Sequence, residues 1–370
     1  MIKKIKDIEK YLNAQYLERE QVIKGMLIAI LARQHVLLVG SPGTAKSAIV
    51  SDLAKCITGT SYFQWLLTRF STPEELFGPV SLKALEQDTF KRNTTNKLPE
   101  AHVSFVDEVF KANSAILNSL LTLANERLFY NNGGIVQSPL MSLIGASNEW
   151  IEEGEGLEAL FDRFILRYEI EGIADGSNFL AMLKGSMPPN RPTITLQELE
   201  QLQYQTEMLV NIPDDVLVGL RDIRDTLKQE GIRPSDRRFR QSLSLLKASA
   251  TMDNRNDVNR KDLSILVHSL WVTPERNERD IVRQVVEDLA LDPNDKELAD
   301  IKNAFNDILD NIGNSFTEFA KNTNAVVESN NKLKSLEQRI SVLPVTSDIT
   351  NLLNQMKVVK EKLMTAALGV

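Results

Sequence analysis

The chain has 370 residues, of which 42% are hydrophobic and 25% are charged, a balance that excludes a disordered or fibrous protein and predicts two or three globular domains. The formal net charge of −7 disfavours a general affinity for nucleic acid or for an anionic membrane surface. One cysteine and three scattered histidines offer neither a disulfide framework nor a Cys/His metal cluster.

Residues 1–20 alternate charged and apolar side chains at helical spacing and lack the apolar run of a signal sequence, so we expect a cytoplasmic protein without a membrane segment. Up to residue 172, short apolar runs alternate with amphipathic helical segments, which is typical of a parallel α/β sheet. The predicted strands are 35–39, 62–67, 103–106, 142–147 and 164–170, with helices at 46–57 and 114–126 and a hairpin at 128–141. Residues 1–172 are therefore expected to form one α/β domain.

Three further segments follow this domain. Residues 173–192 are rich in Gly, Ser, Asn and Pro, a composition that breaks regular structure and predicts a linker. Residues 193–274 show helical spacing without a strand pattern, which predicts a small α-helical domain. Apolar residues of 275–370 recur at intervals of three, four and seven, which predicts a helical bundle or a coiled-coil arm. Two hypotheses remain for this tail: it stabilises the protein as an appendage, or it is an arm that docks a partner.

The sequence GSPGTAKS, residues 40–47, lies between the first strand and the helix after it, which is the context of a phosphate-binding P-loop. Lys46 would contact the β and γ phosphates of a nucleotide, and the hydroxyl of Ser47 would bind Mg²⁺. Ala45 stands where the consensus has its second glycine, so we expect its φ angle to stay below zero. The residues predicted to contact the nucleotide are Gly40, Pro42, Gly43, Thr44, Ala45, Lys46, Ser47 and Ala48.

Polar residues end two further strands. Asp107 and Glu108 follow strand 103–106, where Asp107 would hold Mg²⁺ together with Ser47 and Glu108 would polarise the water that attacks the γ-phosphate. Two acids could instead cap the next helix, but their pairing with a P-loop favours catalysis. Asn148 follows strand 142–147 and would orient that water, unless it only forms a turn.

Two arginines complete the candidate site. Arg163 precedes the last strand and is expected to be exposed at the edge of the α/β domain, where a neighbouring subunit's nucleotide could lie. Arg237 starts a helix of the second domain and is expected to reach the nucleotide of its own subunit. The planar guanidinium suits spread phosphate charge, although surface salt bridges would also account for both residues.

The order and spacing of GSPGTAKS, VSFVDE, SLIGASNE, LEALFDRF and PSDRR resemble the MoxR family of AAA+ ATPases. The stretches RFSTPEELFGP, LPEAHVSFVDEVFKANSAILNSLLTLANER and SDRR are similar to the RavA subgroup, and the likeness covers roughly residues 7–271. It implies a five-stranded AAA+ domain with an insertion at about 80–98, an α-helical lid and a ring of subunits, usually a hexamer. RavA-like proteins interrupt their C-terminal helical region with a small β-rich module, whereas residues 275–370 show helical periodicity throughout.

The resemblance also implies residue roles and partners. Lys46 and Ser47 match the Walker A pair, Asp107 and Glu108 the Walker B pair, Asn148 sensor 1, Arg163 the arginine finger and Arg237 sensor 2. Leu17, Glu18 and Arg19 fall where the family lines the adenine pocket, and Arg127 is a second residue for contact between subunits. The family uses ATP and Mg²⁺, commonly works with a von Willebrand factor A (vWA) domain protein, and remodels or matures protein clients.

The leading hypothesis is thus an ATP-driven remodelling machine. A nucleic-acid motor is disfavoured by the net acidity and by the lack of Lys/Arg runs. A nucleotide-gated scaffold would not need both acids and both arginines, and a monomeric P-loop kinase would not explain Asn148, Arg163 and Arg237.

Overall fold

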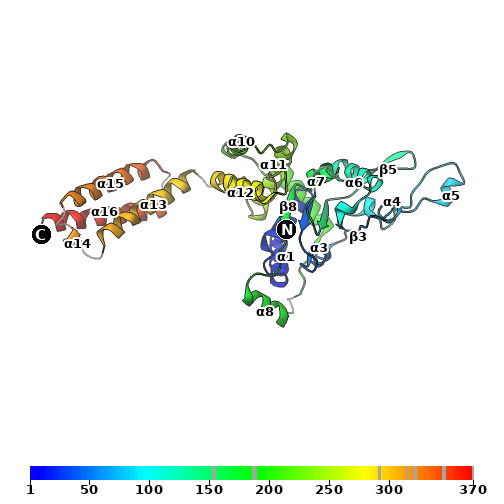
Figure 1. Cartoon of the computed structure of the whole chain (residues 1–370), viewed down its shortest axis with the longest axis horizontal. Coiled ribbons are helices and arrows are strands. Elements are labelled where there is room, and N and C mark those ends of the chain that lie inside the picture. The colour runs from blue at the N-terminus through cyan, green and yellow to red at the C-terminus, as the bar shows by residue number, and fades with distance from the viewer. Residues whose placement is uncertain are drawn as a thin grey trace. The chain divides into compact units, whose positions relative to one another are not determined.

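The computed structural model describes residues 1–151, 156–185, 190–290, 293–313, 316–319, 323–343 and 347–368 (Figure 1). The chain divides into two compact units, Met1–Ala290 and Leu291–Val370. Among the described residues, no helix is long and apolar enough to cross a membrane.

A five-stranded parallel sheet forms the centre of the first unit and confirms the predicted α/β fold. The strand order is β3-β4-β7-β1-β8, and each neighbouring pair is parallel. The strands are β1 (Val36–Val39), β3 (Tyr62–Leu66), β4 (Val103–Asp107), β7 (Ser142–Ser147) and β8 (Leu166–Glu169). All five predicted strands form, with ends that differ from the prediction by no more than about two residues.

Helices cover both faces of the sheet, which explains why its strands read as continuous apolar runs. Along β1, Val36 and Leu38 pack into one apolar core and Leu37 and Val39 into the other, because successive side chains of a strand point to opposite faces. Helices α1 (Ile2–Gln15), α2 (Glu20–Leu31) and α3 (Lys46–Lys55) contribute to the first core, and α6 (Ser114–Glu126) and α7 (Glu158–Arg163) to the second.

The insertion and the hairpin expected from the sequence project side by side from the α/β part (Figure 1). The backbone N–H of Arg92 donates to Oδ1 of Asn131 at 2.8 Å, and Nδ2 of Asn131 donates to the carbonyl of Arg92 at 3.0 Å. These two bonds tie the insertion to the hairpin. The elements are α4 (Pro73–Phe77), α5 (Leu82–Leu85), η1 (Leu98–Glu100), η2 (Val109–Lys111), β5 (Leu128–Asn131) and β6 (Gly134–Gln137).

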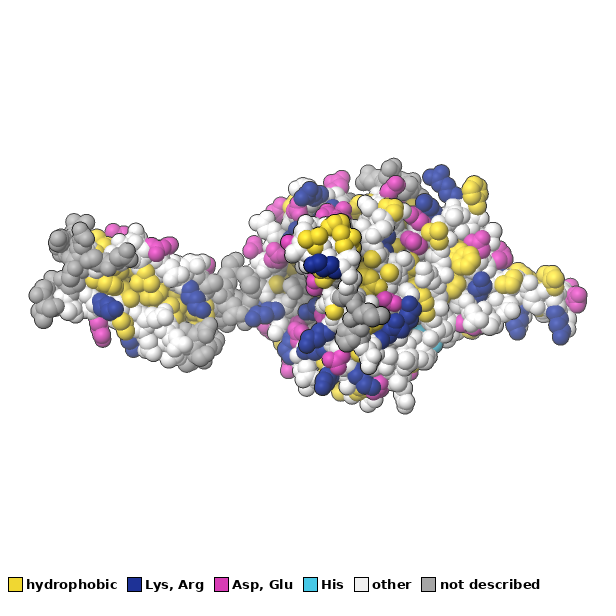
Figure 2. All heavy atoms as spheres, turned by 90° about the horizontal axis from the view of Figure 1, so that it is seen from below, with side chains coloured by type: hydrophobic (Ala, Val, Ile, Leu, Met, Phe, Trp, Pro, Cys, Tyr) yellow, Lys and Arg dark blue, Asp and Glu magenta, His cyan; other side chains and the backbone are white. Residues whose placement is uncertain are grey.

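A helix, α8 (Gly176–Lys184), occupies part of the predicted linker, so the prediction of irregular structure was wrong for these residues. The side chain of Asp175 accepts from the backbone N–H groups of Ser177 and Asn178, both at 2.9 Å, and caps the helix. Leu180 and Leu183 are 56% and 64% exposed, and Figure 2 shows apolar side chains gathered over this helix. Residues 186–189 of the predicted linker lie outside the described residues.

The lid is helical, as predicted, except that β9 (Ile194–Thr195) pairs in parallel with β2 (Ile57–Thr58). Its helices are α9 (Leu196–Leu209), α10 (Asp214–Gln229), α11 (Asp236–Met252), η3 (Arg260–His268) and α12 (Arg276–Ala290). Val282 and Val286 of α12 pack into the core that also contains Leu37, so the first unit ends after Ala290 and not after residue 274. The sequence break at Pro274 is thus a turn within the lid.

The second unit is helical, as expected. Its helices are α13 (Pro293–Ile312), α14 (Phe316–Phe319), α15 (Thr323–Ser341) and α16 (Ser347–Leu368). Ile301, Leu333 and Met356 are fully buried in a core of its own. Its described residues form helices and turns without a strand.

Candidate functional site

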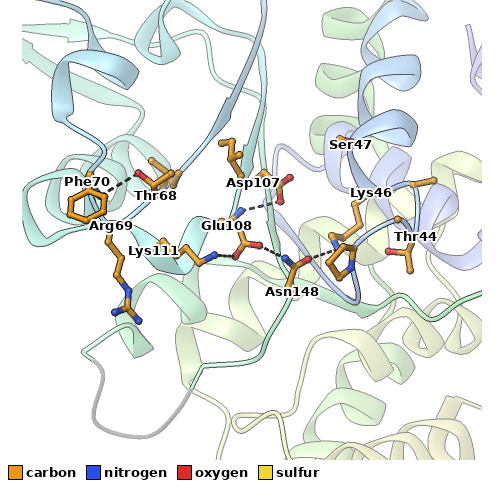
Figure 3. Close-up of a pocket in the computed structure, with 15 residues that line it drawn as sticks. Thr44, Lys46, Ser47, Thr68, Arg69, Phe70, Asp107, Glu108, Lys111 and Asn148 are labelled. Carbon is orange, nitrogen blue, oxygen red and sulfur yellow. Dashed lines mark hydrogen bonds and ion pairs between the residues drawn. The ribbon is translucent and has the colours of Figure 1, made fainter.

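A cavity of about 750 Å³ lies where β1, β4 and β7 end. Ligands of open parallel sheets bind at the carboxyl ends of the strands, so this is the expected place for a site. The cavity brings together the P-loop, both acids and Asn148 (Figure 3). It is lined by Pro42, Gly43, Thr44, Ala45, Lys46, Ser47, Leu66, Leu67, Thr68, Arg69, Phe70, Asp107, Glu108, Lys111 and Asn148. Gly40 and Ala48 flank this lining in the sequence.

The loop between β1 and α3 depends on small residues. A Cβ at Gly40 would lie 2.1 Å from the carbonyl oxygen of Ile170, so only glycine fits there. Gly43 has φ 85°, and Ala45 has φ 67° and ψ 17°. The expectation of a negative φ for Ala45 was therefore wrong. The turn that starts α3 requires the left-handed conformation that the consensus glycine adopts, and Ala45 bears its steric strain.

Replacing Ala45 by glycine is expected to raise the apparent melting temperature of the protein. Relief of a left-handed alanine is worth about 1–2 kcal/mol and the flexibility of glycine costs roughly 0.5–1 kcal/mol, so the net gain lies between zero and about 1.5 kcal/mol. A thermal melt in the absence of nucleotide measures it, as a rise of roughly 2–4 °C per kcal/mol. Ala48→Gly, at an exposed helical position of α3, is the control and should lower the melting temperature. Equal losses in both variants would contradict a strained Ala45.

Four side chains form a row across the cavity (Figure 3). Nζ of Lys46 donates to Oδ1 of Asn148 at 3.1 Å, and Nδ2 of Asn148 donates to Oε1 of Glu108. The other oxygen of Glu108, Oε2, is 3.2 Å from Nζ of Lys111. The sequence placed three of these residues in one site, and the structure joins them by direct contacts.

The P-loop lysine is also bound to its own loop. Nζ of Lys46 donates to the carbonyl oxygens of Gly40 and Ser41, and the side chain is 7% exposed. Burial lowers the pKa of Lys46, an effect that the nearby carboxylates of Asp107 and Glu108 oppose. An ammonium so placed, held by carbonyl groups that it can exchange for phosphate oxygens, suits phosphate binding.

The two acids differ in position. Oδ1 of Asp107 accepts the backbone N–H of Glu108 at 3.0 Å, and Asp107 ends β4 beside Ser47 in the lining of the cavity. Glu108 adopts φ 52°, an unusual angle that ends the strand and directs its carboxylate to Asn148. Strain of this kind recurs at functional sites, in agreement with a catalytic Glu108.

Besides the apolar residues Leu66 and Leu67, sequence reasoning missed four residues that line the cavity, Thr68, Arg69, Phe70 and Lys111. The first three follow β3, whose end lies next to that of β4, and Phe70 is 90% exposed. The rule that neighbouring parallel strands end at one edge would have placed this loop at the site. Lys111 follows Glu108 by three residues, a spacing that brings side chains of a helical turn together.

Leu17 and Glu18 do not line the P-loop cavity. The Glu18 carboxylate accepts the backbone N–H groups of Ala174 at 2.8 Å and Asp175 at 2.9 Å, and these hydrogen bonds and one from Asn178 lower its pKa. Glu18 and Arg19 line a second cavity of about 380 Å³, together with Tyr168, Glu169 and His268. Because Glu169 pairs with Val39, this cavity begins one strand away from the P-loop.

Arg163 and Arg237 lie at the amino-terminal ends of the strands, whereas the P-loop lies at their carboxyl ends. Arg163 precedes β8, whose first residue, Leu166, pairs with Val36 at the start of β1, whereas the P-loop follows the end of β1. A four-residue strand of about 13 Å therefore lies between Arg163 and the P-loop of its own chain. Its side chain is 19% exposed and 3.3 Å from Asp162, so it is less exposed than expected.

The structure places Arg237 away from the P-loop cavity of its own chain, which it was expected to reach. Nη2 of Arg237 donates to Oδ1 of Asn125 at 2.6 Å, near the end of α6. Burial, Arg127 and Arg237 hold the pKa of His35 at about 3, and burial and Arg237 lower the pKa of Arg163. Nε2 of His35, the residue before β1, lies 2.8 Å from the carbonyl oxygen of Ala124, next to Asn125, so Arg237 lies near the ends where the strands begin. Helix α11 packs beside α2 and α9.

Arg127, the second residue expected between subunits, is engaged within the chain. Its Nε donates to the carbonyl of Leu140 at 2.9 Å, and Nη2 donates to the carbonyl of Arg33. Burial and the nearby Arg33 lower the pKa of Arg127 to about 10. Its guanidinium thus holds the end of α6 against β7 and the start of β1.

Comparisons with known proteins agree with an AAA+ domain followed by a lid domain. Residues 3–206 match the family described as "MoxR domain in the MoxR-vWA-beta-propeller ternary systems", and residues 215–286 match an AAA lid domain. A crystal structure of a candidate ATPase from Cytophaga hutchinsonii has a TM-score of 0.63 at 18% identity, covering 78% of this chain and 93% of that one, which supports the fold.

The sequence is also similar to several curated proteins. Two uncharacterized proteins of Methanocaldococcus jannaschii are 42% and 41% identical over 270 and 276 residues, which is 72% and 73% of this chain and 70% and 72% of theirs. The chaperone MoxR1 of Mycobacterium tuberculosis is 28% identical over 156 residues, 41% of this chain and 40% of that one. With a family match over more than half of its length, this chain belongs to the MoxR family of AAA+ ATPases.

Proposed function

We propose that the protein hydrolyses ATP at sites shared between neighbouring copies of a ring and uses the reaction to remodel or mature partner proteins. The observation that carries the proposal is the row of Lys46, Asn148 and Glu108 across one cavity. A phosphate-binding ammonium, a polar amide and a carboxylate base in one cavity are the groups that hydrolysis of a γ-phosphate requires.

The residues of the cavity fit ATP with Mg²⁺. Ser47 and Asp107 line it together and offer the hydroxyl and carboxylate oxygens that Mg²⁺ prefers. Bound there, Mg²⁺ would neutralise charge on the phosphate oxygens. We further propose that the adenine base lies in the second cavity, beside Glu18 and Arg19, because that cavity begins one strand away from the start of the P-loop.

The chain's own groups would act in sequence. Lys46 would exchange the carbonyl groups of Gly40 and Ser41 for β and γ phosphate oxygens. Asn148 would orient a water molecule, and Glu108 would accept its proton as the oxygen attacks the γ-phosphate. The bond between the β and γ phosphates would break, and ADP and phosphate would leave.

The positions of the arginines and the P-loop at the two ends of the sheet's strands support a shared site. Arg163 and Arg237 lie at the edge where the strands begin, away from the P-loop of their own chain. In a closed ring of head-to-tail contacts, that edge of one copy can face the P-loop edge of the next. We propose that both arginines contact the neighbour's ATP, in a ring that is a hexamer as is usual for the resembling family.

The family description supports a partner class. It names systems of a MoxR protein, a vWA protein and a β-propeller protein, and we propose a vWA-domain partner and a protein client here. The motifs RFSTPEELFGP and SDRR favour the RavA-like subgroup. We propose a cytoplasmic location, and a supporting or partner-docking role for the second unit.

ATPase rate per subunit against protein concentration tests the shared site, with the mass measured by light scattering with and without ATP. We expect the rate per subunit to rise steeply over the concentrations at which the mass rises from one copy to a ring. A rate per subunit that stays constant at concentrations where the protein is a monomer would contradict the proposal and favour a kinase or a scaffold.

A further inference from the structure

Asp162 lies between two arginines with different surroundings. Its Oδ1 accepts from Nη2 of Arg238 at 2.9 Å and from Nε of Arg238 at 3.3 Å. Its other oxygen, Oδ2, is 3.3 Å from Nη1 of Arg163. One carboxylate therefore joins lid helix α11 to the last two residues of α7.

Arg238 is anchored on every side. It is 2% exposed, and its Nη1 donates to the carbonyl oxygens of Ser269 at 2.8 Å and Ile165 at 3.3 Å. Its Nη2 also donates to the backbone carbonyl of Asp162 at 2.9 Å. A buried guanidinium with all its nitrogens engaged has one available orientation, so Arg238 fixes the turn between α7 and β8 relative to the lid.

Arg163, in contrast, has few restraints. It ends α7, its Nε is buried without a hydrogen-bond partner in the described structure, and its ion pair is with Asp162. The positive charges of Arg238, Arg167 and Arg163 act on the carboxylate of Asp162. Burial alone would raise the pKa of Asp162, but Arg238 and the other arginines outweigh it and lower that pKa. The carboxylate is therefore charged and available to hold both guanidinium groups.

We propose that Asp162 and Arg238 are positioning residues, which hold the guanidinium of Arg163 in the orientation that contact with a neighbouring copy's ATP requires. This inference rests on the proposed function, in which Arg163 acts across the subunit contact. Because Arg238 belongs to the lid, a movement of the lid would displace Asp162 and, through it, Arg163. The lid of one copy would thus control hydrolysis in the next.

The test is a double-mutant cycle with Asp162→Asn and Arg163→Ala, read by kcat and KM for ATP. Asparagine keeps the shape of Asp162 and removes its charge, and the backbone contacts of Arg238 to Ile165 and Ser269 remain. We expect kcat to fall about tenfold with little change in KM or in ring mass, because a misdirected arginine weakens transition-state contact alone. In the Arg163→Ala background, adding Asp162→Asn should leave the single-turnover rate unchanged.

Two controls separate positioning from stability. Asp222→Asn breaks an Arg–Asp pair of 2.7 Å on the lid surface and should leave kcat unchanged. Asp162→Glu keeps the charge and should retain more activity than Asp162→Asn. An unchanged kcat for Asp162→Asn, or an equal tenfold loss in both backgrounds, would overturn the inference while the proposed function stands. Full activity of Arg163→Ala would overturn both.

Discussion

Glu108→Gln is expected to bind ATP as tightly as the unchanged protein and to hydrolyse it about 10²–10⁴ times more slowly, the usual contribution of a general base. The amide oxygen of glutamine can still accept from Asn148, so the row across the cavity persists. The amide cannot take a proton from water, whereas the P-loop contacts of Lys46 and Ser47 are unaffected. Steady-state phosphate release gives the rate, and titration with a fluorescent ATP analogue gives the affinity.

Glu126→Gln is the matched control, because Glu126 is an exposed carboxylate at the far end of α6. It should hydrolyse ATP at the unchanged rate. If Glu108→Gln also turned over normally, Glu108 would not be the base. If the Glu108→Gln variant also lost ATP binding, the carboxylate of Glu108 would be needed to maintain the structure of the pocket.

Arg163→Ala is expected to lower kcat by about 10³-fold or more, the scale of an arginine that stabilises charge on a transferred phosphoryl group. ATP binding and assembly should persist, because Arg163 does not line the P-loop cavity of its own chain. The measurement is the ATPase rate at a concentration where light scattering shows rings. Arg221→Ala, which removes an exposed lid arginine paired to Asp222, should have no effect. A rate within twofold of the unchanged protein would remove Arg163 from the mechanism.

The sequence predicted the parts of the site that local patterns determine. The P-loop, Asp107, Glu108 and Asn148 each follow a buried strand, and parallel strands end at one edge, so these residues had to meet. The strands themselves were visible as apolar runs because helices cover both faces.

Other features depend on contacts that no local pattern reveals. Helix α8 forms in a stretch that looked irregular, because Asp175 caps it and Glu18, far away in the chain, holds its start. The location of Arg237 depends on how the lid packs on the α/β part, which tertiary contacts of α11 decide. Ala45 adopts a left-handed conformation because the loop requires it, although alanine ordinarily has a negative φ.

The missed cavity residues illustrate the same limit. Arg69 and Phe70 belong to a stretch that signalled a family likeness, but without the sheet order their place beside the P-loop could not be assigned. Asp162 and Arg238 lie 76 positions apart, and only the fold brings the lid to the turn before β8. Contacts between residues so far apart in the chain could not be predicted from the sequence alone.

Mixing two inactive variants tests the shared site most directly. Glu108→Gln keeps Arg163, and Arg163→Ala keeps Glu108, so a ring built from both contains contacts where an intact Glu108 meets an intact Arg163. In an equal mixture about one contact in four is of this kind, so ATPase activity should reappear at roughly a quarter of the unchanged rate. If mixed rings form and stay as inactive as either variant alone, Arg163 and Glu108 do not act on one ATP across a subunit contact, and the account fails.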